Sequence, residues 1–210
     1  MNQKTETRER LIEAARRIFA DKGYEAASVR EITAAASANL GAITYHFGSK
    51  QGLYDAVLAS LLDPLAREVG QAGPADAGKD VSALDRIDGL VARVFEHLAA
   101  NPDLQLLVLQ HVGTRQALPG PIYERLPLLI GRLAAEIRRG QADGSIRSGD
   151  PELLAFSVIA QPMYFGLVSR LAPDRLKGAG GGSPSAAVLS AHARRFIRSG
   201  LAAGTEAENG

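Results

Sequence analysis

Apolar residues recur every three to four positions along almost the whole chain, and this spacing restricts the fold more than any other feature. Between about 6 and 22, for example, one face carries Leu11, Ala15, Ile18 and Phe19. That is the period of an amphipathic α-helix, and the alternation of a half-buried strand is nearly missing. The sequence therefore predicts an all-α protein.

Residues that cap and interrupt helices divide this pattern into segments. Ser28 is expected to cap a short second helix, and a third short helix should run from about 40 to 47. Ser49 is expected to cap a long fourth helix, in which Pro64 should introduce a kink or an end. The further helices that we predict cover about 82–100, 102–118, 122–141, 151–172 and 185–202.

Composition and charge exclude several classes of protein. The 24 Lys and Arg residues nearly balance the 23 Asp and Glu residues, so the bulk charge neither indicates nor excludes a nucleic-acid partner. Cysteine is absent, which excludes disulfides and thiolate metal sites. No apolar run approaches the roughly 18 residues of a membrane helix, and no signal peptide is evident. We expect a soluble, cytoplasmic protein with no membrane partner.

Enzyme and metal signals are weak. No HExxH motif is present, and the glycine-rich stretch at 178–183 lacks the Gly-Lys-Ser/Thr that closes a phosphate-binding loop. A flexible loop explains that stretch better. We predict no catalytic residue, no metal site and no cofactor.

Residues 28–47 carry the clearest functional pattern. Two short predicted helices are joined there by a tight break near Ser37. Such a pair is a helix-turn-helix, in which the second helix enters the major groove of DNA. The apolar residues that can form its small core are Val29, Ile32, Ala36, Ile43 and Phe47.

The second of these helices should present Ala42, Thr44 and Tyr45 outward. The Thr44 hydroxyl can donate or accept a hydrogen bond at a base edge, and its methyl can pack on a thymine methyl. Tyr45 and His46 can reach phosphates or sugars, and Lys50 adds positive charge at the start of the next helix. The first sixty residues hold eight Lys and Arg against seven Asp and Glu, so no massive basic patch supplies affinity.

Residues 8–58 resemble the DNA-binding domain of the tetracycline-repressor (TetR) family of transcription regulators. The resemblance lies in the stretches RERLIEAARRIFADKGYEAASVREIT and GAITYHFGSKQGLY, about a quarter of the chain. It implies an all-helical homodimer with an N-terminal DNA reader and a larger C-terminal domain that binds a ligand and dimerises. Matching positions assign phosphate contacts to Ser28, Tyr45, His46 and Lys50, and base-facing roles to Ala42 and Thr44. The full predicted DNA-binding set is Ser28, Arg30, Leu40, Ala42, Thr44, Tyr45, His46 and Lys50.

Three positions depart from the family pattern. Ser37 stands where glycine is usual, Ala38 where valine is usual, and Thr44 where tyrosine is frequent. Serine tolerates a left-handed turn less well than glycine does. Threonine and tyrosine also present different groups to the groove, so the family's base preferences are not carried over to this chain.

The remaining helices suggest a regulatory domain. We predict a DNA-binding domain at 1–50, a helical regulatory and dimerisation domain at 51–204, and a tail at 205–210. The Gly-, Ala- and Pro-rich stretch at 70–80 is expected to be a connector between two parts of the chain. The segments 104–112 and 156–167 are apolar on more than one face, which suits a cavity lining or a bundle core. The predicted ligand-binding residues are Phe95, Gln110, His111, Tyr123, Phe156, Gln161 and Tyr164. Alternatively, their polar groups are satisfied in an ordinary core.

The last two long helices could pack against their copies as a four-helix dimer interface, although periodicity cannot separate this from internal packing. Our hypothesis is a ligand-responsive repressor that binds a palindromic operator in double-stranded DNA as a homodimer. A small, mostly apolar effector would release it. The alternatives are a DNA-binding regulator without an effector, a transcriptional activator, and a helical enzyme or binding module whose N-terminal fold is coincidental.

Overall fold

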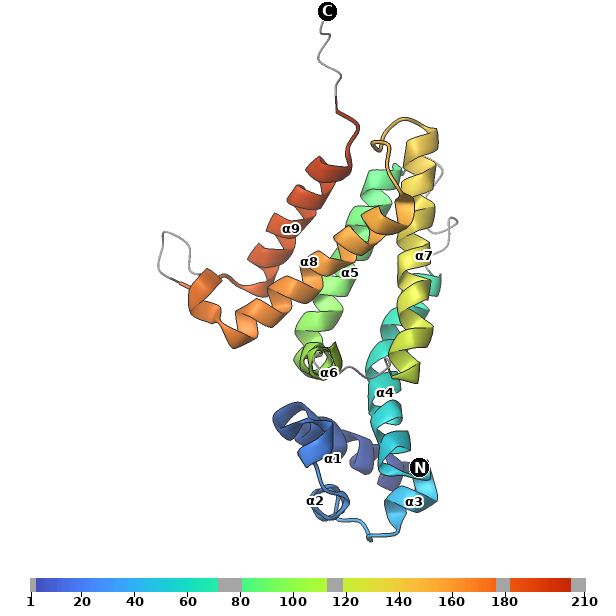
Figure 1. Ribbon diagram of the computed structural model, residues 1–210, viewed down its shortest axis with the longest axis vertical. Helices are drawn as coiled ribbons and strands as arrows, with labels where there is room; N and C mark the ends of the chain where they lie inside the picture. The colour runs from blue at the N-terminus through green and yellow to red at the C-terminus, as the bar shows by residue number, and fades with distance from the viewer. Residues whose placement is uncertain (1–2, 72–80, 113–118, 177–181, 205–210) are drawn as a thin grey trace, which may run out of the picture. The chain divides into compact units, whose positions relative to one another are not determined.

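The computed structural model describes residues 3–71, 81–112, 119–176 and 182–204. Apart from one isolated bridge between Ile146 and Ala202, regular structure in these residues is helical, which confirms the all-α prediction. The elements, coloured along the chain in Figure 1, are α1 (Gln3–Ala26), α2 (Val29–Ala35), α3 (Ala42–Phe47), α4 (Lys50–Gln71), α5 (Ala83–Ala100), α6 (Pro102–Val112), α7 (Gly120–Ala142), α8 (Pro151–Leu171), the 3-10 helix η1 (Pro173–Leu176) and α9 (Ala186–Leu201).

Several predicted helix ends are confirmed because they depend on local capping. The Ser185 and Asp150 side chains accept hydrogen bonds from the amides of Val188 and Leu153, at the starts of α9 and α8. Ser49 accepts one from the Gly52 amide. Helix α4 continues through Pro64 to Gln71, so this proline does not end it. The predicted connector lies almost wholly outside the described residues, as does the tail at 205–210.

The chain divides into two compact units that do not follow its order. Unit 1 combines residues 1–64 with 101–125, and unit 2 combines 65–100 with 126–210. Unit 1 therefore contains α1, α2, α3, most of α4 and, unexpectedly, α6. The predicted domain boundary after residue 50 stays a prediction.

An aromatic cluster forms much of the core of unit 1. The Phe19 and Tyr54 rings meet edge to face with their centres 5.0 Å apart, and the Tyr24 ring lies 5.1 Å from that of Tyr54. Tyr54 is fully buried and its hydroxyl donates to the Leu107 carbonyl at 3.4 Å. Burial raises the pKa of Tyr54 to about 12.

Helix α6 packs against α1 within this unit. The Arg16 guanidinium lies 3.0 Å from the Asp103 carboxylate, and both side chains are largely buried. Nearer the end of α1, the Gln110 side-chain amide donates to the Ala20 carbonyl at 3.4 Å. Helix α6 is therefore part of the same core as α1, although residues 65–100, which belong to unit 2, separate it from the rest of unit 1 in the chain.

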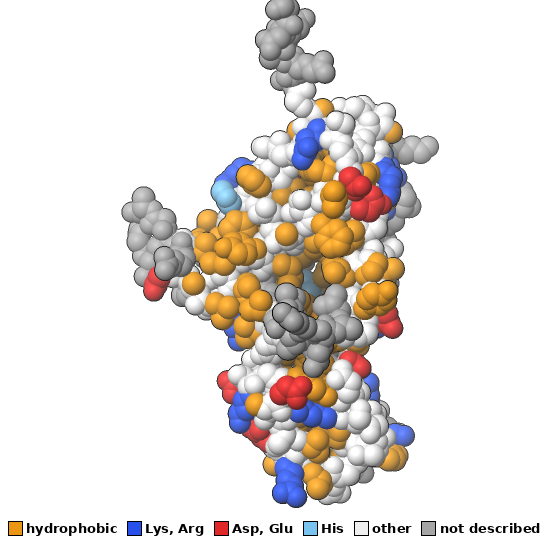
Figure 2. Space-filling model, in the orientation of Figure 1, with side chains coloured by type: hydrophobic (Ala, Val, Ile, Leu, Met, Phe, Trp, Pro, Cys, Tyr) orange, Lys and Arg blue, Asp and Glu red, His pale blue; other side chains and the backbone are white. Residues whose placement is uncertain are grey.

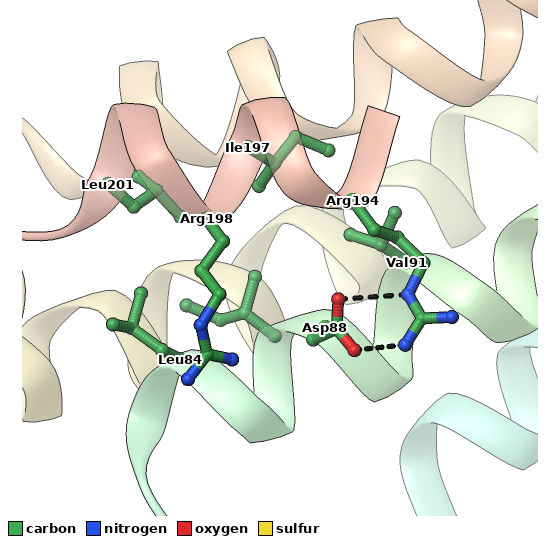
Figure 3. Close-up of a pocket in the computed structure, with 8 residues that line it drawn as sticks. Leu84, Asp88, Val91, Arg194, Ile197, Arg198 and Leu201 are labelled. Atoms are coloured by element: carbon green, nitrogen blue, oxygen red, sulfur yellow. Dashed lines mark hydrogen bonds and ion pairs between the residues drawn. The ribbon is translucent and has the colours of Figure 1, made fainter. Parts of the chain in front are cut away.

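Unit 2 is built around α5, which packs against α8 and α9, and these two also contact each other (Figure 1). Figure 3 shows Asp88 of α5 facing Arg194 of α9, whose guanidinium donates two hydrogen bonds to its carboxylate. One turn away, Arg198 approaches Asp85 at 2.7 Å. The apolar crevice between these helices leaves no room for a water molecule, so it is a packed interface.

A buried carboxylate joins α5 to α7. Glu136 is 1% exposed, and one of its oxygens lies 3.4 Å from the Nε of Arg86 on α5. Arg132 and Arg139 of α7 approach the same carboxylate at 3.0 and 3.4 Å. These are ion-pair distances, although neither oxygen has a hydrogen-bond partner among the described residues. One buried negative charge thus holds three arginines.

Helix α8 contradicts the expectation that no segment is long and apolar enough to cross a membrane. It meets that requirement by length and composition alone. Its N-terminal cap and its contacts with α5 and α9 are those of a helix in a bundle. Much of its surface stays exposed, and Figure 2 shows hydrophobic side chains gathered over it. The large exposed apolar residues of α8 and α9 are Leu153, Phe156, Tyr164, Leu171, Val188 and Phe196.

Candidate nucleic-acid interface

Helix α2 begins at a polar cap. The Ser28 hydroxyl accepts a hydrogen bond from the Glu31 amide at 3.1 Å, as predicted. On the inner face, Ile32 is fully buried, and the buried Thr33 hydroxyl donates back to the Val29 carbonyl at 3.0 Å. The cap and the inner face orient the exposed side of α2, which carries Arg30.

The turn between α2 and α3 depends on Ser37. This residue has φ 49°, in the left-handed region that usually favours glycine. Among the residues that the structure describes, no other non-glycine residue has a positive φ. The turn is held by hydrogen bonds from the Ala38 amide to the Thr33 carbonyl and from the Ala42 amide to the Asn39 carbonyl, both 2.9 Å long. The predicted tight break at Ser37 is confirmed.

Helix α3 separates a buried face from an exposed one. Ile43 is 2% exposed and, with Ala36, fills the small core, whereas Val29 and Phe47 are half-buried at its edge. On the outside, the Tyr45 ring is 68% exposed and Thr44 is also exposed. Gly48, at φ 77°, ends the helix and donates its amide to the Thr44 carbonyl. These two outward side chains are thus carried on a short, well-fixed helix.

An open groove with a volume of about 450 Å³ runs beside α3 in unit 1. One wall is formed by α3 and the preceding turn, including Ala42, Tyr45 and His46 of the predicted set. The other wall comes from the start of α1, where the Arg10 guanidinium donates to the Thr7 hydroxyl at 3.4 Å. The arrangement offers hydrogen-bond donors from two separate helices to a ligand in this groove.

The remaining predicted DNA-binding residues lie outside this groove but in the same unit. Ser28 and Arg30 are exposed at the start of α2, and Leu40, in the turn before α3, is 54% exposed. Lys50 is half-buried, with its ammonium group 4.5 Å from the centre of the Tyr24 ring. Their roles in DNA binding stay predictions.

Sequence reasoning missed the start of α1. The Lys4 ammonium lies 5.1 Å from the centre of the Tyr45 ring, and the Arg8 guanidinium lies 5.4 Å from that of Phe47. The predicted first helix began near residue 6, whereas α1 begins at Gln3. Extending the helical spacing back by one turn would have placed Lys4 and Arg8 on the side of Leu11, toward the helix-turn-helix.

The predicted ligand-binding residues are distributed over both units. Gln110 and Tyr123 belong to unit 1, and the other described members belong to unit 2. Phe95 is buried and Gln161 is half-buried, but Tyr123, Phe156 and Tyr164 are more than half exposed. The side chain of His111 lies outside the described residues. The groove beside α3 and the crevice between α5 and α9 include none of the seven, so the effector site stays a prediction.

Comparison with known proteins identifies relatives of the helix-turn-helix part. Residues 11–57 match the family described as "Bacterial regulatory proteins, tetR family". The HTH-type transcriptional repressor AcnR of Corynebacterium glutamicum is 39% identical over 69 residues, 33% of this chain, and the match spans only 37% of that relative's length. The HTH-type transcriptional repressor DhaR of Mycobacterium sp. strain GP1 is 29% identical, over 82% of this chain and 85% of its own length.

A solved structure shows the same fold over most of the chain. The fatty acid degradation regulator FadR from Bacillus halodurans superposes with a TM-score of 0.72 at 17% identity. The superposition covers 92% of this chain and 98% of that protein. The two proteins therefore share a fold over most of this chain.

Proposed function

We propose that this chain, whose residues 11–57 match the tetR family of bacterial regulatory proteins, is a transcriptional repressor of that family that binds a palindromic operator as a homodimer. We further propose that a small, mostly apolar effector releases it and that it acts in the cytoplasm. Proteins of this family regulate transcription and are not enzymes. The observation that supports the proposal best is the exposure of Thr44 and Tyr45 on a helix whose opposite face, at Ile43, is buried.

Helix α3 suits the major groove. It has only six residues, so its outward side chains lie close together and can reach adjacent base pairs. Thr44 can discriminate bases through its hydroxyl and methyl groups, and Ala42 allows the backbone to approach. Tyr45 and His46 lie at the edge of α3 and are suited to phosphate oxygens.

Residues around α3 supply contacts that position the helix without reading sequence. The exposed Ser28 hydroxyl and Arg30 guanidinium stand at the N-terminal end of α2, and Lys50 stands at that of α4. Helix N-termini favour anions, which strengthens hydrogen bonds to phosphate at these points. Leu40 is exposed beside them and can pack on a sugar.

The exposed apolar face of α8 and α9 supports a homodimer. Six large apolar side chains are exposed on these helices, and large exposed apolar patches mark interaction sites. Two such helices from each protomer would form a four-helix bundle. A second copy would cover α8 and explain its apolar composition, with no need for a membrane. In the dimer, two α3 helices would occupy successive major grooves, roughly 34–36 Å apart.

Release by an effector requires that the ligand bind one state of the dimer better than the other. The predicted ligand-binding residues Phe95 and Gln161 belong to unit 2, where a mostly apolar ligand is the expected class. Helix α4 begins at Lys50 and continues past Leu65, the first residue of unit 2. A displacement of this helix caused by the effector could therefore reach α3. Coupling of this kind is typically worth about 1–3 kcal/mol, a change of about 5–150-fold in DNA affinity.

The test is selection of bound fragments from the source genome by the full-length protein, with Tyr45→Ala selected in parallel. We expect a palindromic sequence from the native protein and its loss in the variant. Thr44→Ala, measured on the recovered site, should relax sequence choice without abolishing binding. Recovery of no sequence above background by the folded dimer, with and without an extract of cell metabolites, would contradict the proposed function.

A further inference from the structure

We propose that the first turns of α1 are a second DNA-contacting element, and that the groove between α1 and α3 seats one sugar–phosphate strand beside the recognition helix. The inference rests on the proposed function. It adds a contact site on a helix outside the helix-turn-helix, and it assigns the groove an occupant.

The groove has the chemistry of a phosphate-binding surface. Its polar lining consists of side chains that donate hydrogen bonds, of the types that contact phosphate and sugar oxygens in protein–DNA complexes. No carboxylate is present among the described residues that line it. The polar residues are Thr7, Arg10, Ser37, Asn39, Tyr45 and His46.

The start of α1 places further positive charge along the same side. Lys4 and Arg8 are exposed, and their cationic groups lie over the rings of Tyr45 and Phe47. On a helix with 3.6 residues per turn, Glu6 and Glu9 fall on a different side of α1 from these two cations. Glu6 lies about 40° around the helix from Arg10, but it does not line the groove.

The position of the groove fits one strand of the duplex. A helix in the major groove, about 12 Å wide, has a sugar–phosphate strand on either side. Tyr45 and His46 belong both to α3 and to the wall of this groove, so a strand that borders α3 on this side would pass between them and Arg10. The groove is open to solvent, so it is accessible to a strand at the protein surface.

The test compares single variants of the full-length protein on one probe. The probe is the fluorescein-labelled duplex that the native protein enriches from a random DNA library, and binding is measured by anisotropy at several salt concentrations. For Arg10→Ala, and separately for Lys4→Ala, the slope of log K against log salt should fall by about one for each protomer. Arg93→Ala is the matched control, because it removes one exposed arginine from α5 in unit 2.

A second readout locates the contact on DNA. Ethylation of individual phosphates should interfere with native binding at positions that flank each half-site, and this interference should disappear for Arg10→Ala while the base preferences stay the same. If Arg10→Ala and Lys4→Ala match Arg93→Ala in slope and in ethylation pattern, the inference is wrong and the proposed function stands. If the native protein enriches no duplex, the proposed function fails and the inference fails with it.

Discussion

The ammonium group of Lys50 lies 4.5 Å from the centre of the Tyr24 ring, where it also donates a hydrogen bond to the Glu25 carbonyl at 3.2 Å. The first residue of α4 is thereby attached to the end of α1. The sequence predicted a phosphate contact for Lys50, and the structure adds a second role that requires no DNA. The two roles can be separated by changing one partner at a time.

Lys50→Ala removes both the charge and the attachment, whereas Tyr24→Leu removes the ring and keeps the charge. Lys50→Ala should lower the free energy of unfolding by about 1 kcal/mol, measured in urea, and Tyr24→Leu should lower it by more, because it also removes the ring that packs on Tyr54. Only Lys50→Ala should reduce the salt dependence of DNA binding, by about one phosphate contact. Equal losses of DNA affinity in both variants, with unchanged salt dependence, would show that Lys50 acts only by holding α4 against α1.

Phe196→Glu tests the dimer. The Phe196 ring is 62% exposed on α9, so a carboxylate there should leave the protomer folded. Buried in an apolar interface, that charge would lack a partner and oppose association. We expect sedimentation equilibrium to give the monomer mass for the variant and the dimer mass for the native protein. Arg93→Glu, which adds a carboxylate on α5, should remain dimeric, and a monomeric native protein would contradict the proposal.

Glu136→Gln tests the buried charge cluster. The substitution keeps the shape of the side chain and leaves Arg86 and two further arginines without their carboxylate. Removing one partner from a buried ion pair typically costs about 3–5 kcal/mol, and we expect a loss in that range in urea unfolding. Glu96→Gln, at an exposed position of α5, serves as the control. A loss below about 1 kcal/mol would show that water compensates the arginines.

Tyr54 predicts how stability falls at alkaline pH. Its pKa is raised by burial to about 12 in the folded protein, against about 10 in the unfolded chain. The raised pKa favours the folded state below pH 10, and this contribution is lost as the pH rises toward 12. The expected loss is about 2–3 kcal/mol over this interval. Tyr54→Phe should show a shallower decline than the native protein between pH 10 and 12, and parallel declines would contradict the assignment.

The sequence predicted the parts of the fold that depend on neighbouring residues. Ser28 and Ser49 cap helices because each hydroxyl lies three residues before the amide that it satisfies. The tight turn at Ser37 was likewise predicted from its immediate neighbours, the two short helices on either side of it. The outward positions of Thr44 and Tyr45 follow from helical period once Ile43 is recognised as core.

The parts that the sequence did not predict depend on residues far apart in the chain. Nothing near Asp103 indicates that it pairs with Arg16, so the membership of α6 in unit 1 was not foreseen. The same is true of the groove, whose walls are separated by about thirty residues. Apolar composition also could not distinguish buried from exposed positions on α8, where Phe156 and Tyr164 were predicted to face a ligand but are exposed.

The discontinuity of unit 1 has a consequence during synthesis. The face of α1 that carries Arg16 meets α6 only after residues 65–100, which belong to unit 2, have been made. At about 5–20 residues per second, the ribosome needs roughly 3–12 s to extend the chain from residue 64 to residue 125. During that time the nascent helix-turn-helix has its own small core, but the face of α1 that α6 will cover stays exposed to solvent and to chaperones.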